Sequence, residues 1–115
     1  MNILVTGGAG YIGSHVVEEL QKSGFTPIVY HNFSTGHEAA VPDDVQLIEG
    51  DIHDVRFAKH IMEQFKIDAV IHFAASSLVG ESMENPSKYY FNNVEGSLHL
   101  LEAMRGAGVD RIVFS

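Results

Sequence analysis

Short apolar runs alternate along the chain with amphipathic segments of helical period. The apolar runs predict five strands, over Asn2–Thr6, Thr26–Tyr30, Val45–Glu49, Ala69–His72 and Arg111–Ser115. The segments between them predict three helices, at Ile12–Ser23, after Asp54 and at Pro86–Arg105. Strands that alternate with helices are typical of a parallel sheet built from βαβ units. The pattern therefore predicts a single α/β domain.

Residues at the ends and along the faces of the helices support this assignment. Asp54 is expected to cap the second helix, whose inward face would carry Phe57, Ala58, Ile61, Met62 and Phe65. Asn85-Pro86 is a typical helix start, and Gly106 with Gly108 is expected to end the third helix. One stripe of that helix carries Tyr90, Val94, Leu98 and Leu101. Residues 31–44 show no period and are predicted to form a loop.

Composition narrows the classes of function. The 115 residues are 45% hydrophobic and 19% charged, which is the balance of one globular domain. The net charge is −8 and the basic residues are scattered, so neither nucleic acid nor a membrane is an expected partner. No signal peptide or segment of transmembrane length is recognisable, and a cytoplasmic protein is expected.

No metal site is expected. The chain has no cysteine, which excludes disulfides and thiolate ligands. Its seven histidines form no HxH or HExxH pair with the spacing that a zinc site needs.

A glycine-rich segment, Gly7-Gly8-Ala9-Gly10-Tyr11-Ile12-Gly13, joins the first strand to the first helix. Glycines at this position let the chain turn tightly, approach a pyrophosphate and pack the helix on the strand. The free N–H groups of the helix start then bind the anion, aided by the helix dipole. A glycine-rich turn without a ligand is the alternative for the pattern alone, but the flanking strand and helix favour dinucleotide binding.

Four further segments, each at a separate place, narrow the interpretation. They are Gly50-Asp51-Ile52, Val70-Ile71-His72-Phe73-Ala74-Ala75, Val79-Gly80-Glu81-Ser82 and Tyr89-Tyr90-x-Asn92-Asn93-Val94-x-Gly96. Together with the glycine segment they resemble the extended short-chain dehydrogenase/reductase family, and within it the NAD-dependent sugar-nucleotide epimerases. The resemblance covers the whole chain. It implies a Rossmann-like, doubly wound parallel sheet of strand order 3-2-1-4-5, with residues 1–115 forming a partial NAD-binding domain that stops after the fifth strand.

The resemblance also implies which residues contact NAD. Besides the glycines Gly7, Gly10 and Gly13, the pyrophosphate would lie over Tyr11 and Ile12. The adenosine ribose would lie along His31, Asn32, Phe33, Ser34, Thr35 and Gly36. Asp51 and Ile52 would flank the adenine, with Asp51 accepting from its amino group. The path to the nicotinamide would be lined by Phe73, Ala74, Ala75, Ser76 and Ser77, and closed by Asn92.

Each of these positions has a simpler structural explanation. Phe73 and Ala74 could be ordinary core residues at a strand end, and Asn92 an exposed helix residue. Asp51 could be a turn or capping carboxylate. The binding interpretation gains support because all these residues fall at carboxyl ends of strands, where open α/β sheets bind ligands.

His31 departs from the family pattern, which has an Asp at the end of the second strand to accept from both ribose hydroxyls. Neutral imidazole offers one acceptor nitrogen and imidazolium none. We expect this loss to weaken NAD binding about ten- to hundredfold. A switch to NADP is disfavoured because no Lys or Arg lies near His31 in the sequence.

The catalytic groups of the family are a second departure. The resemblance implies a Ser or Thr after the fifth strand and a Tyr-x-x-x-Lys pair on the next helix, with NAD⁺ taking hydride from a UDP-sugar. The four tyrosines of this chain have no lysine four residues later. We therefore expect no catalytic residue within these 115 residues, no substrate domain, and a fragment that is inactive alone.

The resemblance leaves other possibilities open. The Pro86–Arg105 helix pairs across a dimer interface in the family, and the fifth strand would present an exposed edge, so both could self-associate. Related dehydratases and reductases share the glycine segment, although Val79-Gly80-Glu81-Ser82 fits the epimerases better. A non-catalytic module that binds a nucleotide or a partner subunit is a third alternative.

Overall fold

A computed structural model describes residues 1–6, 11–31, 42–73 and 86–114, with the backbone alone for 11–14 and 86–93. Five parallel strands form one sheet in the order β3-β2-β1-β4-β5. The strands are β1 (Asn2–Thr6), β2 (Thr26–His31), β3 (Gln46–Glu49), β4 (Ala69–His72) and β5 (Ile112–Phe114). This order confirms the doubly wound, Rossmann-like sheet predicted from the sequence.

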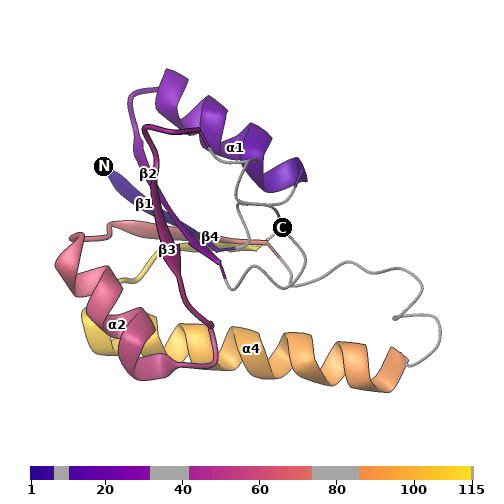
Figure 1. The fold of residues 1–115 in the computed structure, drawn as a ribbon. Helices are drawn as coiled ribbons and strands as arrows, with labels where there is room; N and C mark the ends of the chain where they lie inside the picture. Colours follow the sequence, from indigo (N-terminus) through magenta and orange to yellow (C-terminus); the bar gives the residue numbers. More distant parts are fainter. Residues whose placement is uncertain (7–10, 32–41, 74–85, 115) are drawn as a thin grey trace.

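Helices cover both faces of the sheet. Helix α1 (Tyr11–Lys22) lies on one face, and α2 (Val55–Gln64) and α4 (Pro86–Ala107) lie side by side on the other (Figure 1). Alternate residues of a strand point to opposite faces, so the strands contribute side chains to two apolar clusters, one on each face of the sheet. Leu4, Ile28 and Val70 pack with the α2–α4 layer. Ile3, Val5 and Val29 pack with Val17 of α1.

The helix ends follow their capping residues. The Asp54 carboxylate accepts a hydrogen bond from the backbone N–H of Phe57 at 3.1 Å, which confirms the predicted cap of α2. Helix α4 continues past Gly106, where the sequence predicted its end. Gly108, with a φ of +77°, follows the last helical residue, since glycine adopts this left-handed conformation without strain. Strands β1 and β4 have the predicted bounds, and the other predicted boundaries agree with the structure to within one residue.

One residue predicted to face the core is exposed. Phe57 is 36% accessible, whereas Ala58, Ile61 and Met62 of the same helix are buried and Phe65 is partly buried. Its ring lies 6.0 Å from the ring of Tyr30, so it covers the edge of the core rather than filling it. Across residues 1–6, 11–31, 42–73 and 86–114, no helix is long and apolar enough to cross a membrane.

Candidate nucleotide-binding site

The carboxyl ends of the parallel strands meet at one edge of the sheet. Thr6 of β1 lies beside Tyr30 of β2 on one side and beside His72 of β4 on the other. The chain leaves β1 toward β2 through α1, and it returns to β4 on the opposite side of β1 after α2. Open α/β sheets bind ligands at such a point, where the strand order reverses. Among the described residues, His31 ends β2 at this edge and Phe73 directly follows β4 there.

Helix α1 begins at Tyr11, within the glycine segment that follows β1. Gly7 and Gly10 lie outside the described residues, and Tyr11, Ile12 and Gly13 are described by their backbone only. No acidic residue occupies the first turn of α1. The first turn of a helix has N–H groups without partners inside the helix, and the positive end of its dipole favours an anion. The start of α1 therefore has the chemistry of a phosphate site.

The ends of β2 and β3 bring three predicted residues into one neighbourhood. His31 is the last residue of β2, and its carbonyl accepts a hydrogen bond of 3.0 Å from the backbone N–H of Gly50. Asp51 and Ile52 follow Gly50 directly. Partial burial lowers the pKa of His31, which favours the neutral imidazole near pH 7. A neutral ring has one acceptor nitrogen.

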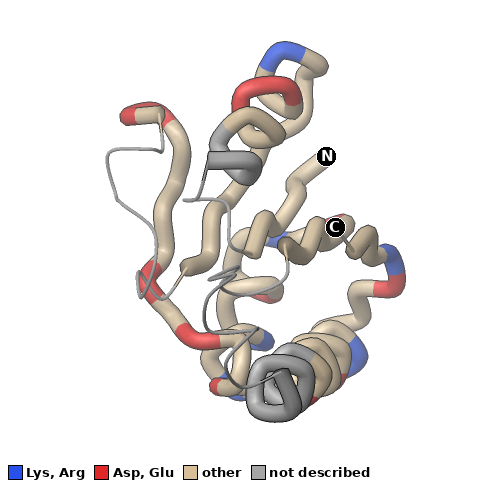
Figure 2. The backbone as a smooth tube through the Cα atoms, turned by 90° about the vertical axis from the view of Figure 1, so that its right-hand side faces the viewer, with Lys and Arg blue, Asp and Glu red and all other residues tan. Residues whose placement is uncertain are grey.

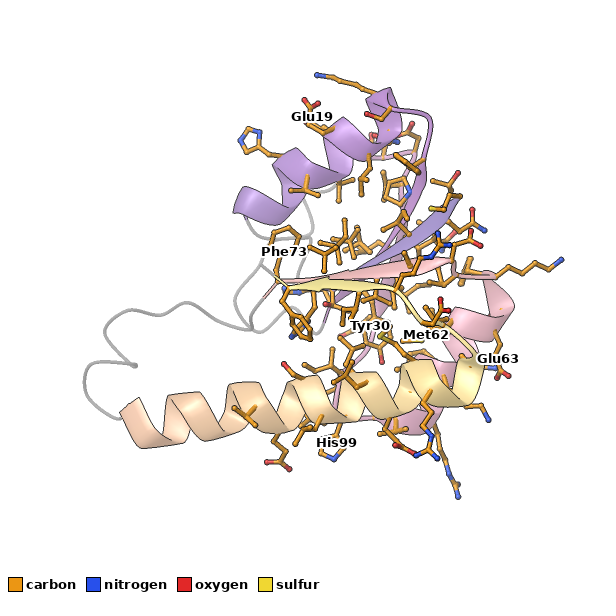
Figure 3. All side chains as sticks on the ribbon, turned by 180° about the vertical axis from the view of Figure 1, so that it is seen from behind. Glu19, Tyr30, Met62, Glu63, Phe73 and His99 are labelled. Atoms are coloured by element: carbon orange, nitrogen blue, oxygen red, sulfur yellow. The ribbon has the colours of Figure 1, made fainter. Side chains whose placement is uncertain are left out.

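The turn that carries Asp51 is supported by Tyr30, a residue that the sequence analysis did not select. The Tyr30 hydroxyl donates to the carbonyl of Asp51 at 2.9 Å. Burial, with the charges of Asp54 and Asp51 nearby, raises the pKa of Tyr30 well above its ordinary value, so the donor proton is retained. A Cβ at Gly50 would lie 2.6 Å from Tyr30 Cζ, which explains the need for glycine there. Figure 3 shows Tyr30 between the sheet and the α4 layer.

The carboxylate of Asp51 is exposed and held by His53. Its Oδ1 accepts from the backbone N–H of His53 at 2.9 Å and from the ring Nδ1 of His53 at 2.8 Å. Partial burial opposes ionisation, but the hydrogen bonds from His53 and the charges of His53 and His99 outweigh it and lower the pKa of Asp51. Asp51 therefore does serve as a turn carboxylate, and this use does not exclude a contact with adenine.

Ile52 lies against α4. A Cβ at Gly96 would lie 2.7 Å from Ile52 Cδ1 and 3.5 Å from His53 Nε2, so this glycine lets the turn approach the helix closely. An exposed carboxylate beside a half-buried isoleucine suits adenine, which has a polar edge and an apolar face. The two residues therefore fit the role that the family resemblance implies.

A buried polar pair joins the ends of β1 and β4. Thr6 is 1% and His72 is 4% accessible, and Thr6 Oγ1 lies 2.5 Å from His72 Nδ1. Burial lowers the pKa of His72, which favours its neutral form. Phe73 follows on the α1 side of the sheet, where it packs against the Val5–Val17 cluster (Figure 3). The simpler explanation of Phe73 as core at a strand end thus holds in part.

Other predicted residues cannot be placed. Asn32, Phe33, Ser34, Thr35 and Gly36, and Ala74, Ala75, Ser76 and Ser77, lie outside the described residues, and Asn92 is known only as a backbone position in α4. The residues that sequence reasoning missed are Tyr30, His53 and His99. A signal existed for Tyr30, because this tyrosine ends the predicted strand Thr26–Tyr30 and a glycine, Gly50, follows the next strand along the chain. None existed for the pairing of His53 with Asp51.

The described part of this site lacks a cluster of metal ligands, and residues 31–54 lack the basic side chains of Lys and Arg. No three His, Asp or Glu side chains within the described ranges are arranged to hold a metal ion. Residues 31–54 contain no Lys or Arg, and the tube between β3 and α2 in Figure 2 is correspondingly free of blue. Backbone amides, rather than basic side chains, would have to neutralise a bound phosphate.

Comparison with known proteins identifies the family. Residues 3–115 match the model of the NAD dependent epimerase/dehydratase family. The UDP-glucose 4-epimerase of Streptomyces lividans is 52% identical over 113 residues, which cover 97% of this chain and 34% of the relative. The UDP-glucose 4-epimerase of Lacticaseibacillus casei is 49% identical over 115 residues, which cover 100% of this chain and 35% of the relative.

A solved structure agrees with this relationship. The crystal structure of UDP-glucose 4-epimerase from Brucella ovis in complex with NAD superposes with a TM-score of 0.90 at 50% identity, covering 98% of this chain and 34% of that one. The chain thus spans about a third of the length of the relatives that it matches. Its fold and sequence correspond to their N-terminal, NAD-binding portion. The chain belongs to the NAD-dependent epimerase/dehydratase family.

Proposed function

We propose that this chain binds NAD at the carboxyl edge of its sheet. The observation that carries the proposal is that α1 starts within the glycine segment that follows β1, at the point where the strand order reverses. The pyrophosphate would lie on the N–H groups of Gly10–Gly13. The adenine would lie between Asp51 and Ile52, and the nicotinamide beyond Phe73. The Brucella ovis relative, described in complex with NAD, supports this assignment.

We further propose that His31 makes this binding weaker than in relatives with Asp. A half-buried neutral imidazole at the end of β2 can accept from one ribose hydroxyl, whereas a carboxylate accepts from both. The absence of Lys and Arg from residues 31–54 argues against a site for the 2′-phosphate of NADP.

Epimerisation of UDP-sugars is proposed for a protein that contains this domain, not for these 115 residues on their own. The family resemblance assigns proton transfer to a Tyr-x-x-x-Lys pair, and this sequence contains none. The chain would supply the NAD⁺ that accepts and returns the hydride, while other residues bind the sugar nucleotide and move the proton.

Two apolar surfaces support a proposal of self-association. Val94, Leu98 and Leu101 on α4 are 41%, 60% and 38% accessible, and Val113 and Phe114 of β5 are 60% and 54% accessible. Exposed apolar side chains of this size, clustered on one helix stripe and on an edge strand, favour contact with another protein surface.

An NADH fluorescence titration of the purified chain tests the proposal. We expect saturable binding by the unaltered chain and loss of binding in Gly10→Val, since a side chain there blocks the approach of the pyrophosphate. Gly106→Ala, at the far end of α4, is the matched control and should bind normally. A complex with NAD lodged away from Gly10–Gly13, or equal binding by Gly10→Val, would contradict the proposal.

A further inference from the structure

The side chain of His53 is not among the predicted nucleotide contacts, yet it is the direct partner of Asp51. Among the described residues, the two hydrogen bonds to the Asp51 carboxylate come from His53, and both end on Oδ1. A carboxylate can only accept, so His53 Nδ1 must carry the proton of this bond. The ring and the backbone N–H of one residue therefore hold one oxygen in place and leave Oδ2 to a ligand.

The surroundings of His53 hold its ring in this position. A Cβ at Gly96 would lie 3.5 Å from His53 Cε1 and Nε2, so the ring lies over the part of α4 that has no side chain. The His99 ring, one helical turn further along α4, lies 5.4 Å from the His53 ring, centre to centre. His99 Nδ1 is buried without a hydrogen-bond partner among the described residues, so it does not compete with Asp51 for the His53 proton. Figure 3 shows His99 on the side of α4 that faces away from the sheet.

We propose that His53 is a positioning residue for nucleotide recognition: it holds Asp51 Oδ1 so that Oδ2 accepts from the amino group of adenine. The inference rests on the proposed function, in which Asp51 contacts the adenine. An exposed aspartate would otherwise rotate between staggered conformers, and fixing it in advance reduces the entropy lost on binding. His53 does not touch the nucleotide, so its effect should be confined to the preference for the adenine amino group.

The first test needs no nucleotide. The Asp51 carboxyl carbon is followed by NMR through an acid titration in the unaltered chain, in His53→Ala and in His53→Asn. We expect the Asp51 pKa to rise in His53→Ala, where only the backbone N–H remains, and to be partly restored in His53→Asn, whose side-chain amide can donate. His60→Ala, an exposed histidine on α2, is the control for removal of a histidine. An unchanged Asp51 pKa in His53→Ala would overturn the inference.

The second test compares NADH with the analogue in which hypoxanthine replaces adenine and the amino group is absent. The unaltered chain should prefer NADH, and His53→Ala should lose about three- to tenfold of that preference, with affinity for the analogue little changed. A merely structural role would weaken both nucleotides equally. His53→Asn should recover part of the preference.

The outcomes separate this inference from the proposed function. If Asp51→Ala removes the preference for NADH and His53→Ala does not, the positioning role is overturned and NAD binding at Asp51 stands. If the unaltered chain binds neither nucleotide, or if Asp51→Ala leaves the preference intact, the assignment of Asp51 to adenine fails, and the role of His53 fails with it.

Discussion

The two halves of the carboxyl edge are supported in different ways. On the β2–β3 side, the turn after β3 is fixed by a buried tyrosine hydroxyl, by two glycines that allow close approach, and by a histidine on its carboxylate. On the β4–β5 side, the outer strand presents Val113 and Phe114 with more than half of their surface exposed. The difference indicates that the β2–β3 half, which is the adenosine half of the proposed NAD site, is assembled from contacts within this chain. The other half exposes apolar surface that a further polypeptide surface could cover.

Gly50→Ala should have the largest effect on the adenosine half. The new Cβ would lie 2.6 Å from Cζ and from the hydroxyl oxygen of Tyr30, a side chain that is only 1% accessible and cannot move away freely. We expect a loss of about 1–3 kcal/mol in the free energy of unfolding, measured by urea denaturation, together with weaker NADH binding. Gly106→Ala is the control, because its Cβ would meet only the flexible chain of Lys59 at 3.0 Å. Equal stability of both variants would show that the Tyr30–Gly50 contact is unimportant.

His31→Asp should strengthen nucleotide binding at the same half. A carboxylate at the end of β2 accepts from both ribose hydroxyls, so NADH affinity should rise about ten- to hundredfold. NADPH affinity should not rise, because the new charge repels the 2′-phosphate. Parallel fluorescence titrations with the two nucleotides measure both effects. The claim that His31 weakens binding fails if NADH binds the two chains equally.

The stability of the fold should depend on pH through His72, which lies at the centre of the carboxyl edge. Burial lowers its pKa in the folded state, so the unfolded chain takes up a proton first as the pH falls. Stability is therefore full above the ordinary histidine pKa of 6.5 and decreases as the pH falls below it, by at most about 1.4 kcal/mol per pH unit for one proton. His31 contributes in the same direction.

The dependence of the free energy of unfolding on pH is measured by urea denaturation at several pH values from about 5 to about 8, on both sides of the unperturbed histidine pKa. His72→Gln should make it shallower by removing the larger part, since His72 is 4% accessible and His31 is only half-buried. His31→Asn should reduce it less. A slope unchanged by His72→Gln would contradict the assignment.

The sequence predicted the parts of this molecule that depend on local pattern. The order of elements and the Asp54 cap follow from period and capping residues. The strand order, and the exposure of the stripe of Val94, Leu98 and Leu101, follow instead from the family resemblance. The prediction that Phe57 faces the core was wrong, because helical period cannot distinguish a core position from one at the edge of the core. The pairing of His53 with Asp51 was also out of reach, since it depends on side-chain conformation over the glycine of a distant helix.

The smallest effects on stability are expected on the exposed half, where Val113→Lys and Leu98→Lys should change the free energy of unfolding by about 0.5 kcal/mol or less. Both side chains are 60% accessible, so little packing is lost. A charge on an edge strand or on an apolar helix stripe nevertheless opposes association. Sedimentation or size-exclusion measurements over a range of protein concentrations should therefore show a smaller average mass for whichever variant alters the contact.

Gln64→Lys, which adds the same charge at the exposed end of α2, controls for net charge and should not change the mass. A response to Leu98→Lys alone would assign association to α4, and a response to Val113→Lys alone would assign it to β5. If all three variants match the unaltered chain, these apolar surfaces do not mediate self-association. The apolar side chains of α4 and β5 would then be exposed without contacting a second copy of this chain, because replacing them with lysine would have left the average mass unchanged at every protein concentration.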